Sequence, residues 1–146
     1  MKDYLEFRTV VTDTVEAFFN EQGPLYAPRK VYWPGIPDDD EPPSDAVWSR
    51  LEIRQFTDRV ATLAGQYNVK RHRVTGAIYL QIFHPKSRGE LLRPAAELAI
   101  LAQRRFQSNL GHYGITVKQS LIDPVGAKDA YYQHLVTVRY EYDEVY

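Results

Sequence analysis

Apolar and polar residues alternate most clearly in residues 71–89, where the pattern predicts a long strand followed by a helix. The apolar side chains of the strand occupy even positions, at Val74, Gly76, Ile78, Leu80 and Ile82. The odd positions between them are held by Arg73, Thr75, Ala77, Tyr79 and Gln81. A period of two is typical of a strand with one face against a core. We therefore expect a covered apolar face at the centre of the fold.

A helix is predicted after Pro85. Ser87 and Glu90 have the spacing of a capping box. Helical spacing then relates the apolar residues Leu91, Ala95, Leu98, Ala99, Ala102, Phe106 and Leu110. Gly111 is expected to end this helix. Pro94 leaves two alternatives open: it kinks the helix, or residues 87–93 form a separate turn and Pro94 opens the main helix.

A second amphipathic helix is predicted over residues 3–20. Its apolar stripe consists of Phe7, Val11, Thr14 or Val15, and Phe18. Residues 31–33 then form a short extended segment, and residues 34–46 read PGIPDDDEPPSDA. Prolines and acids at this density exclude a packed helix and a central strand. We expect an exposed loop at about residues 34–46, either as a binding segment or as a passive surface loop.

A second strand is predicted directly after this loop. Val47, Leu51 and Ile53 would face the core, and the opposite, charged face would carry Trp48, Arg50, Glu52 and Arg54. Residues 55–70 fit either a further strand with a turn at Gly65 or a short helical excursion. We favour strands joined by a loose hairpin.

Two closing strands are predicted at the end of the chain. The first places Ile115, Val117 and Leu121 on one face, and the second does the same for His134, Val136, Val138, Tyr140 and Tyr142. The sequence DPVGA at residues 123–127 predicts the turn between them. These elements favour an α+β fold, with a mostly antiparallel β-sheet and two main α-helices packed on one face. The length suits a single domain of residues 1–146.

Composition narrows the classes of function. The 146 residues carry a formal net charge of -1, which provides no general attraction to nucleic acid or an anionic membrane. The absence of cysteine excludes a disulfide framework, a thiolate metal site and a cysteine nucleophile. No apolar run reaches the roughly 20 residues that span a bilayer, and the start MKDYLEFRTV is too acidic for a signal peptide. We therefore expect synthesis in the cytosol and no membrane partner.

Recognisable catalytic and metal-binding motifs are missing from the sequence. His72, His84, His112 and His134 do not have the spacing of a metal motif. The acids at residues 38–41 lack the glycine and the spaced glutamate of a calcium loop. G-x-S-x-G, the P-loop and G-x-G-x-x-G are also absent. We therefore expect no enzymatic activity, no cofactor and no metal.

Charge is segregated along the chain. Basic residues gather on the polar faces of the predicted strands, and acids gather in the loop. Opposite charges on one small subunit allow head-to-tail packing, although a solvated face explains the basic residues equally well. The candidate protein-interface residues are Trp33, Asp38, Asp39, Asp40, Glu41, Arg50, Arg54, Arg71, Arg73 and Tyr79.

The succession of these segments resembles the tail terminator, or tail completion, proteins of long-tailed bacteriophages, also called minor tail protein U-like proteins. The N-terminal amphipathic helix and the segment VYWPGIP, which enters a proline-rich loop, carry part of the resemblance. The rest is carried by the strands VWSRLEIRQF and RVTGAIYLQIFHP, the helix start KSRGELLRPAAELA and the closing strand HLVTVRYEYDEVY.

This resemblance implies a subunit of a six-membered ring that caps the head-proximal end of the tail tube. Such a ring terminates tail polymerisation and provides the head-joining surface. The implied partners are further copies of the chain, the tail tube protein and a head-completion or neck protein, and DNA only passes through the lumen. Some relatives are monomers in solution and form the ring only on the tube. The implied location is the virion, after assembly in the host cytoplasm.

Three alternatives stay open. A neck or head-completion protein would share the size and the context but face the portal. A small ligand-binding or enzymatic α/β domain would have a polar pocket around His84, His134 or Tyr140. A nucleic-acid-binding module would bind DNA in a strongly salt-dependent way. Within the ring hypothesis, changing Arg71 and Arg73 to Glu is expected to disrupt assembly.

Overall fold

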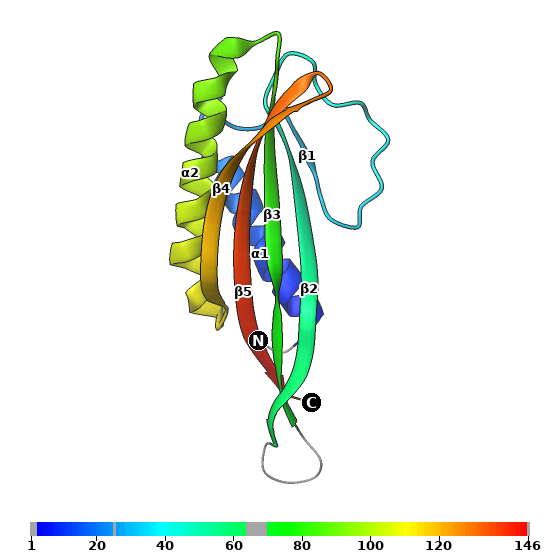
Figure 1. Cartoon of the computed structure of the whole chain (residues 1–146), viewed down its shortest axis with the longest axis vertical. Coiled ribbons are helices and arrows are strands. Elements are labelled where there is room, and N and C mark those ends of the chain that lie inside the picture. Colours follow the sequence, from blue (N-terminus) through cyan, green and yellow to red (C-terminus); the bar gives the residue numbers. More distant parts are fainter. Residues whose placement is uncertain (1–2, 25, 64–69, 146) are drawn as a thin grey trace.

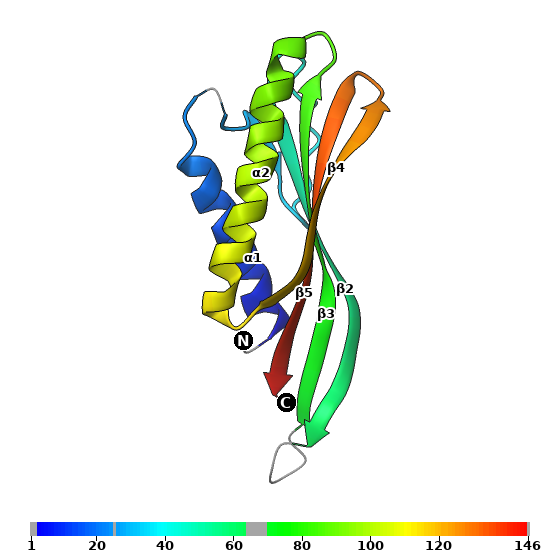
Figure 2. The same ribbon diagram turned by 60° about the vertical axis from the view of Figure 1, so that its left-hand side comes forward.

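A computed structural model describes residues 3–24, 26–63 and 70–145 of the chain. Its helices are α1 (Tyr4–Asn20) and α2 (Leu92–Asn109), with short 3-10 turns η1 (Gly89–Leu91) and η2 (Leu110–Tyr113) at the two ends of α2. The strands are β1 (Lys30–Tyr32), β2 (Trp48–Leu63), β3 (Lys70–Pro85), β4 (Thr116–Lys128) and β5 (Tyr131–Val145). Both helices cover the same face of one sheet, which confirms the predicted α+β class (Figures 1 and 2).

The described strands form a mixed sheet in the order β1-β2-β3-β5-β4. β1 runs parallel to β2, and all the other neighbours are antiparallel. Residues 55–63 continue β2, so the strand alternative for this segment is correct and the helical one is wrong. The predicted turn at Gly65 lies outside the described residues.

The core lies between the helices and the inner face of β3 and β5. The predicted stripe of α1 is buried, and so are the inward positions of β3 from Val74 to Ile82. Phe7 of α1 packs against Tyr140 and Tyr142 of β5, with ring centroids 4.3 and 4.7 Å apart. Aromatic pairs at these distances add to the burial of their apolar area. This contact fixes α1 across the sheet.

Gly76 makes room for Tyr140 on the inner face. The two residues are register partners on β3 and β5, and the Tyr140 hydroxyl donates a hydrogen bond to the Arg54 carbonyl at 3.1 Å. A Cβ atom on Gly76 would lie 2.0 Å from the Arg54 carbonyl oxygen and 2.4 Å from the Tyr140 hydroxyl. The ladder of β2 is interrupted by a bulge between Gln55 and Thr57. The Tyr140 hydroxyl therefore bonds the backbone of β2 directly before this bulge. Burial raises the pKa of this hydroxyl.

The start of α2 differs from the prediction. Ser87 and Glu90 form no capping box, because Glu90 pairs with Arg88 and the turn η1 precedes the helix. Pro94 is the third residue of α2. The amide groups of the first turn have no intrahelical acceptor, so proline is tolerated there. The separate-turn alternative is thus correct, although the helix opens at Leu92.

The end of α2 also differs. The chain continues through η2 after Asn109, and the left-handed residue that stops it is Gly114, with φ 77°. The prediction that Gly111 ends the helix was therefore wrong. A residue without a side chain adopts this left-handed conformation without strain.

A bulge in β4 changes which residues face the core. The register between β4 and β5 shifts between Val117 and Gln119. Leu121 consequently lies on the uncovered face and is 45% exposed, whereas Ile122 packs against the core. The prediction that Leu121 faces inward was wrong, because one extra residue in a strand reverses the facing of all that follow.

The predicted DPVGA turn is also wrong. β4 continues through these residues to Lys128, and the turn consists of Asp129 and Ala130. Asp129 has φ 56°, in the left-handed region that aspartate tolerates better than most residues. Pro124 fits the strand because β4 is an edge strand, where a missing backbone donor can face outward.

The close approach at Gly76 predicts a specific loss of stability. Gly76→Ala should lower the free energy of unfolding by about 1–3 kcal/mol, because the new methyl group overlaps the Arg54 carbonyl and the Tyr140 hydroxyl. Urea unfolding measures this change. Gly23→Ala is the matched control, since its Cβ would meet nothing within 4 Å, and it should stay within about 0.5 kcal/mol of the parent. Equal stabilities of the two variants would contradict this account of Gly76.

Candidate interaction surface

The sheet face opposite the helices is the main candidate surface. Figure 2 shows both helices on one side of the sheet and none on the other. The outward positions of β2 and β3 form cross-strand pairs along this face, including Arg50 with Gln81 and Glu52 with Tyr79. The same face of β5 carries Thr137, Arg139, Glu141 and Asp143. Polar side chains thus line the uncovered side of the strands whose other side forms the core.

Two of the predicted interface residues are engaged within the subunit. The Arg73 Nε atom lies 3.2 Å from a carboxylate oxygen of Glu141 and 3.2 Å from one of Asp143. Arg71 lies 3.5 Å from the other Asp143 oxygen, and Lys118 lies 3.2 Å from Glu141. The hydrogen bond with Asp143 raises the pKa of Arg73. The basic surface expected at Arg71 and Arg73 is therefore largely neutralised by β5.

The acidic loop lies beside β1, on the opposite side of the molecule from α2 (Figure 1). Residues 33–47 form no helix or strand. Lys30 pairs with Asp38 and lies 3.4 Å from Asp40. The Tyr32 hydroxyl donates a hydrogen bond to the Asp40 carbonyl at 2.7 Å. These contacts attach the loop to β1.

The electrostatics of the loop follow from these pairs. The hydrogen bond between Asp38 and Lys30 lowers the pKa of the carboxyl and raises that of the amine. Asp39 and Glu41 are exposed. Part of the predicted acidic run therefore has a structural role, and the outer acids face the solvent.

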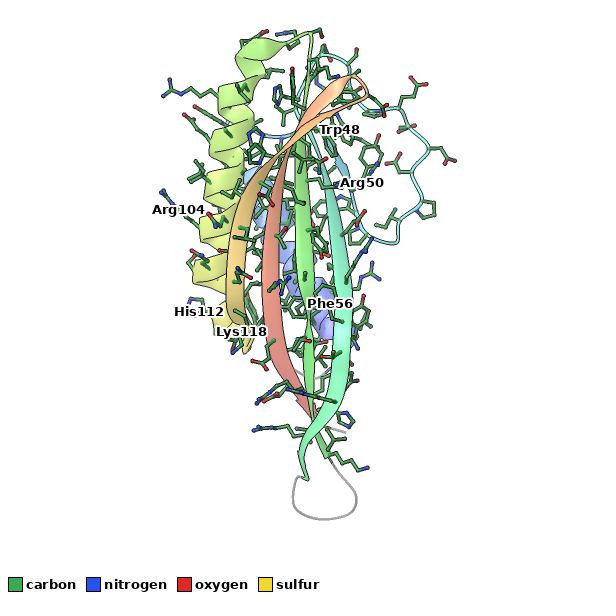
Figure 3. The ribbon with its side chains drawn as sticks, viewed as in Figure 1. Trp48, Arg50, Phe56, Arg104, His112 and Lys118 are labelled. Atoms are coloured by element: carbon green, nitrogen blue, oxygen red, sulfur yellow. The ribbon has the colours of Figure 1, made fainter. Side chains whose placement is uncertain are left out.

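An aromatic cluster that the sequence interpretation missed lies at one end of the uncovered face. Trp48 stacks on Phe83 with centroids 4.0 Å apart and meets Tyr131 edge-on at 5.2 Å. The guanidinium of Arg50 lies 5.8 Å from the Trp48 ring centroid and 5.3 Å from that of Tyr32 (Figure 3). A hollow of about 210 Å³ opens between this cluster and Pro42. The alternation of apolar and polar positions places Trp48 and Phe83 on the outer face of the sheet, and this pattern could have predicted the cluster.

The remaining predicted residues lie in different places. Trp33 packs against the hydrophobic core and not on the uncovered face. Arg54 and Tyr79 do lie together, with the guanidinium 5.9 Å from the ring centroid. Arg54 is also 3.8 Å from Glu52. The ten predicted residues are thus distributed over the loop, the aromatic end, the middle and the salt-bridged end of the sheet.

The histidines named for a ligand pocket are part of the protein interior. His84 is 1% exposed, His134 is 9% exposed, and their rings lie 6.2 Å apart. Tyr140 is fully buried against α1. Within the described structure the Nδ1 atoms of His84 and His134 have no hydrogen-bond partner. Burial lowers the pKa of both imidazoles, and His134 lowers that of His84 further.

The described residues form neither a cluster of metal ligands nor a helix that could span a membrane. Across residues 3–24, 26–63 and 70–145, no group of three or more histidine or acidic side chains could hold a metal ion. None of the helices in this part of the chain has the length and apolar character needed to cross a bilayer.

Comparisons with known proteins bear on the fold alone. No family model matches the sequence, and no curated protein matches it at a significant level. One solved structure, whose name states no function, is similar over 93% of this chain and 92% of its own, with a TM-score of 0.64 and 18% identity. This likeness shows that the α+β architecture occurs in another protein.

The buried histidines predict that acid destabilises the fold. The unfolded chain takes up protons near the ordinary histidine pKa of about 6.5, whereas burial keeps the folded histidines neutral to lower pH. The free energy of unfolding should therefore fall as the pH drops from about 7 to 5, by at most about 1.4 kcal/mol per pH unit for each histidine.

Urea unfolding across this pH range, in the parent and in His84→Gln and His134→Gln, measures the histidine contribution. Each variant should show a shallower dependence on pH than the parent. The exposed His112→Gln is the control and should keep the parental slope. Identical slopes in all four proteins would show that His84 and His134 do not cause the acid sensitivity.

Proposed function

We propose that this chain is a structural subunit that caps the head-proximal end of a phage tail tube as a ring. The ring stops tail polymerisation and offers the surface to which the head is joined, and the chain acts within the virion without catalysis. The resemblance in residues 31–37, 47–56, 73–85 and 134–146 suggests this class. The observation that carries the proposal is a subunit with two unlike ends: stacked aromatic rings around Trp48 lie at one end of the uncovered sheet face, and arginine pairs with Glu141 and Asp143 lie at the other.

A terminator needs two unlike surfaces. One surface binds the last ring of the tube, and the other must not accept a further tube subunit. If subunits related by rotation about the tube axis present the same face to the tube, the two faces of the ring are different. A subunit whose sheet has an aromatic end at Trp48 and a salt-bridged end at Arg73 meets this requirement.

Charge placement supports contacts between neighbouring subunits. The acidic loop lies beside β1, and the exposed Arg104 lies on α2, at the opposite side of the molecule (Figures 1 and 3). Opposite charges on opposite sides favour a head-to-tail contact, which closes into a ring when its rotation allows. Arg71 and Arg73 are less suitable for this contact, because Glu141 and Asp143 already engage them. Reversing their charge would also strain the fold.

Polymerisation of tail tubes in the presence of the chain tests the proposed function. Tube protein encoded in the same gene neighbourhood is assembled with and without the purified chain, and negative-stain electron microscopy measures tube length and tube ends. We expect shorter tubes, each with a ring at one end. Unchanged tube length together with binding to a portal or neck complex would favour the neck-protein alternative and overturn termination.

A matched pair of variants tests the role of the acidic loop. Asp39→Lys with Glu41→Lys reverses two exposed loop acids, and Asp13→Lys with Glu16→Lys makes the same change on the exposed side of α1. The loop variant should cap fewer tubes at equal concentration, whereas the α1 variant should act as the parent does. Equal loss in both variants would point to a general effect of net charge.

A further inference from the structure

Two strand edges of the sheet are open, one at each side. β1 pairs with β2 only at the three positions from Trp48 to Arg50, so within the described ladder the rest of β2 has no partner on that side. Among the described strands, β4 is the edge at the other side and pairs with β5 alone. Open edges expose backbone donors and acceptors that can bond another strand.

The two open edges lie at the same level of the sheet. Leu51 is opposite Leu80 on β3, Leu80 is opposite Val136 on β5, and Val136 is opposite Ile122 on β4. In the same way, Arg54 is opposite Ala77 on β3, and Ala77 is opposite Arg139 on β5. Arg139 is in turn opposite Gln119 on β4. Residues 51–54 of β2 and residues 119–122 of β4 therefore occupy equivalent positions along the strand direction.

The strand directions are also compatible. β2, β3, β5 and β4 are each antiparallel to the next, so three reversals leave β4 running opposite to β2. A second copy related by rotation about an axis along the strands keeps these directions. It therefore presents its β4 antiparallel to the β2 edge of the first copy, at the matching level and without sliding.

Irregular backbone limits this pairing to one stretch. β2 has a bulge between Gln55 and Thr57, and β4 has one between Val117 and Gln119. Pro124 marks the other end of the regular segment of β4. Bulges and prolines prevent pairing along an edge, so the segments between them are the parts that remain competent. These are the two segments at the same level.

We propose that residues 51–54 of one copy pair antiparallel with residues 119–122 of a second copy, so that the sheet continues from subunit to subunit. The inference rests on the proposed ring and names the contact that closes it. The contact is head-to-tail, because the two edges are different segments of the chain. Backbone hydrogen bonds hold it, as in other cases where a strand is added to an open sheet edge.

Engineered disulfides test the pairing directly, because the chain contains no cysteine. The matched pairs are Glu52→Cys with Leu121→Cys and Arg54→Cys with Gln119→Cys, each with both residues at one level of the uncovered face. Within one copy β3 and β5 separate the two edges, which puts them about 14 Å apart. A disulfide needs Cα atoms no more than about 7 Å apart, so only two different copies can be linked.

Oxidation of the matched pairs at high protein concentration should give a ladder of covalently linked oligomers that ends in a closed ring. A thiol reductant should break these links. Glu52→Cys with Leu101→Cys, which places the second thiol on the exposed side of α2, is the control and should not form the ladder. The single variants Glu52→Cys and Leu121→Cys should form no covalently linked oligomers under the same conditions.

Two outcomes overturn the edge pairing. One is failure of both matched pairs to link, whether or not rings are seen by electron microscopy. Another is efficient dimerisation of the single Glu52→Cys variant, which would mean that two β2 edges meet. Failure of the edge pairing can be distinguished from failure of the proposed function. If the chain caps tubes but its matched pairs do not link, the edge pairing is refuted and tail termination stands. If the matched pairs link into rings that never bind tubes, tail termination is refuted and the edge pairing stands.

Discussion

The packing of both helices against one face of β3 and β5 is the constraint on which the rest of the structure depends. Phe7 and the α2 stripe bury the inner side of these strands. The other side of the sheet then requires different stabilisation. Stacked aromatic rings around Trp48 stabilise one end, and arginine pairs with Glu141 and Asp143 stabilise the other. The same constraint leaves a polar face and two edges free for neighbours.

Gly76 connects the core to the open edge. Its missing side chain lets Tyr140 reach the Arg54 carbonyl on β2, directly before the bulge that ends the regular part of that edge. A core contact thereby helps to fix the backbone of the segment that we propose to pair with another copy. Core packing and assembly are linked physically in this way, since a displaced β2 edge would no longer match β4.

Much of the fold could be predicted from the sequence, because the alternation in β3 and the stripes of both helices are strong local signals. The register of β4 could not, since a single bulge moved Leu121 outward and Ile122 inward. The candidate interaction surface could be predicted from the sequence even less well. Arg71 and Arg73 have counterions on β5, far away in sequence, and Trp33 turned out to pack against the core. Local patterns carry no information about such partners.

A subunit whose open edges meet in a ring should bury the backbone amides of both edges when it assembles. Hydrogen exchange of the backbone amides at residues 51–54 and 119–122, compared between the monomer and the assembled state, tests it most directly. We expect assembly to slow exchange in both segments, with no comparable change on the exposed side of α1. Assembly that leaves both edges exchanging as in the monomer would contradict it.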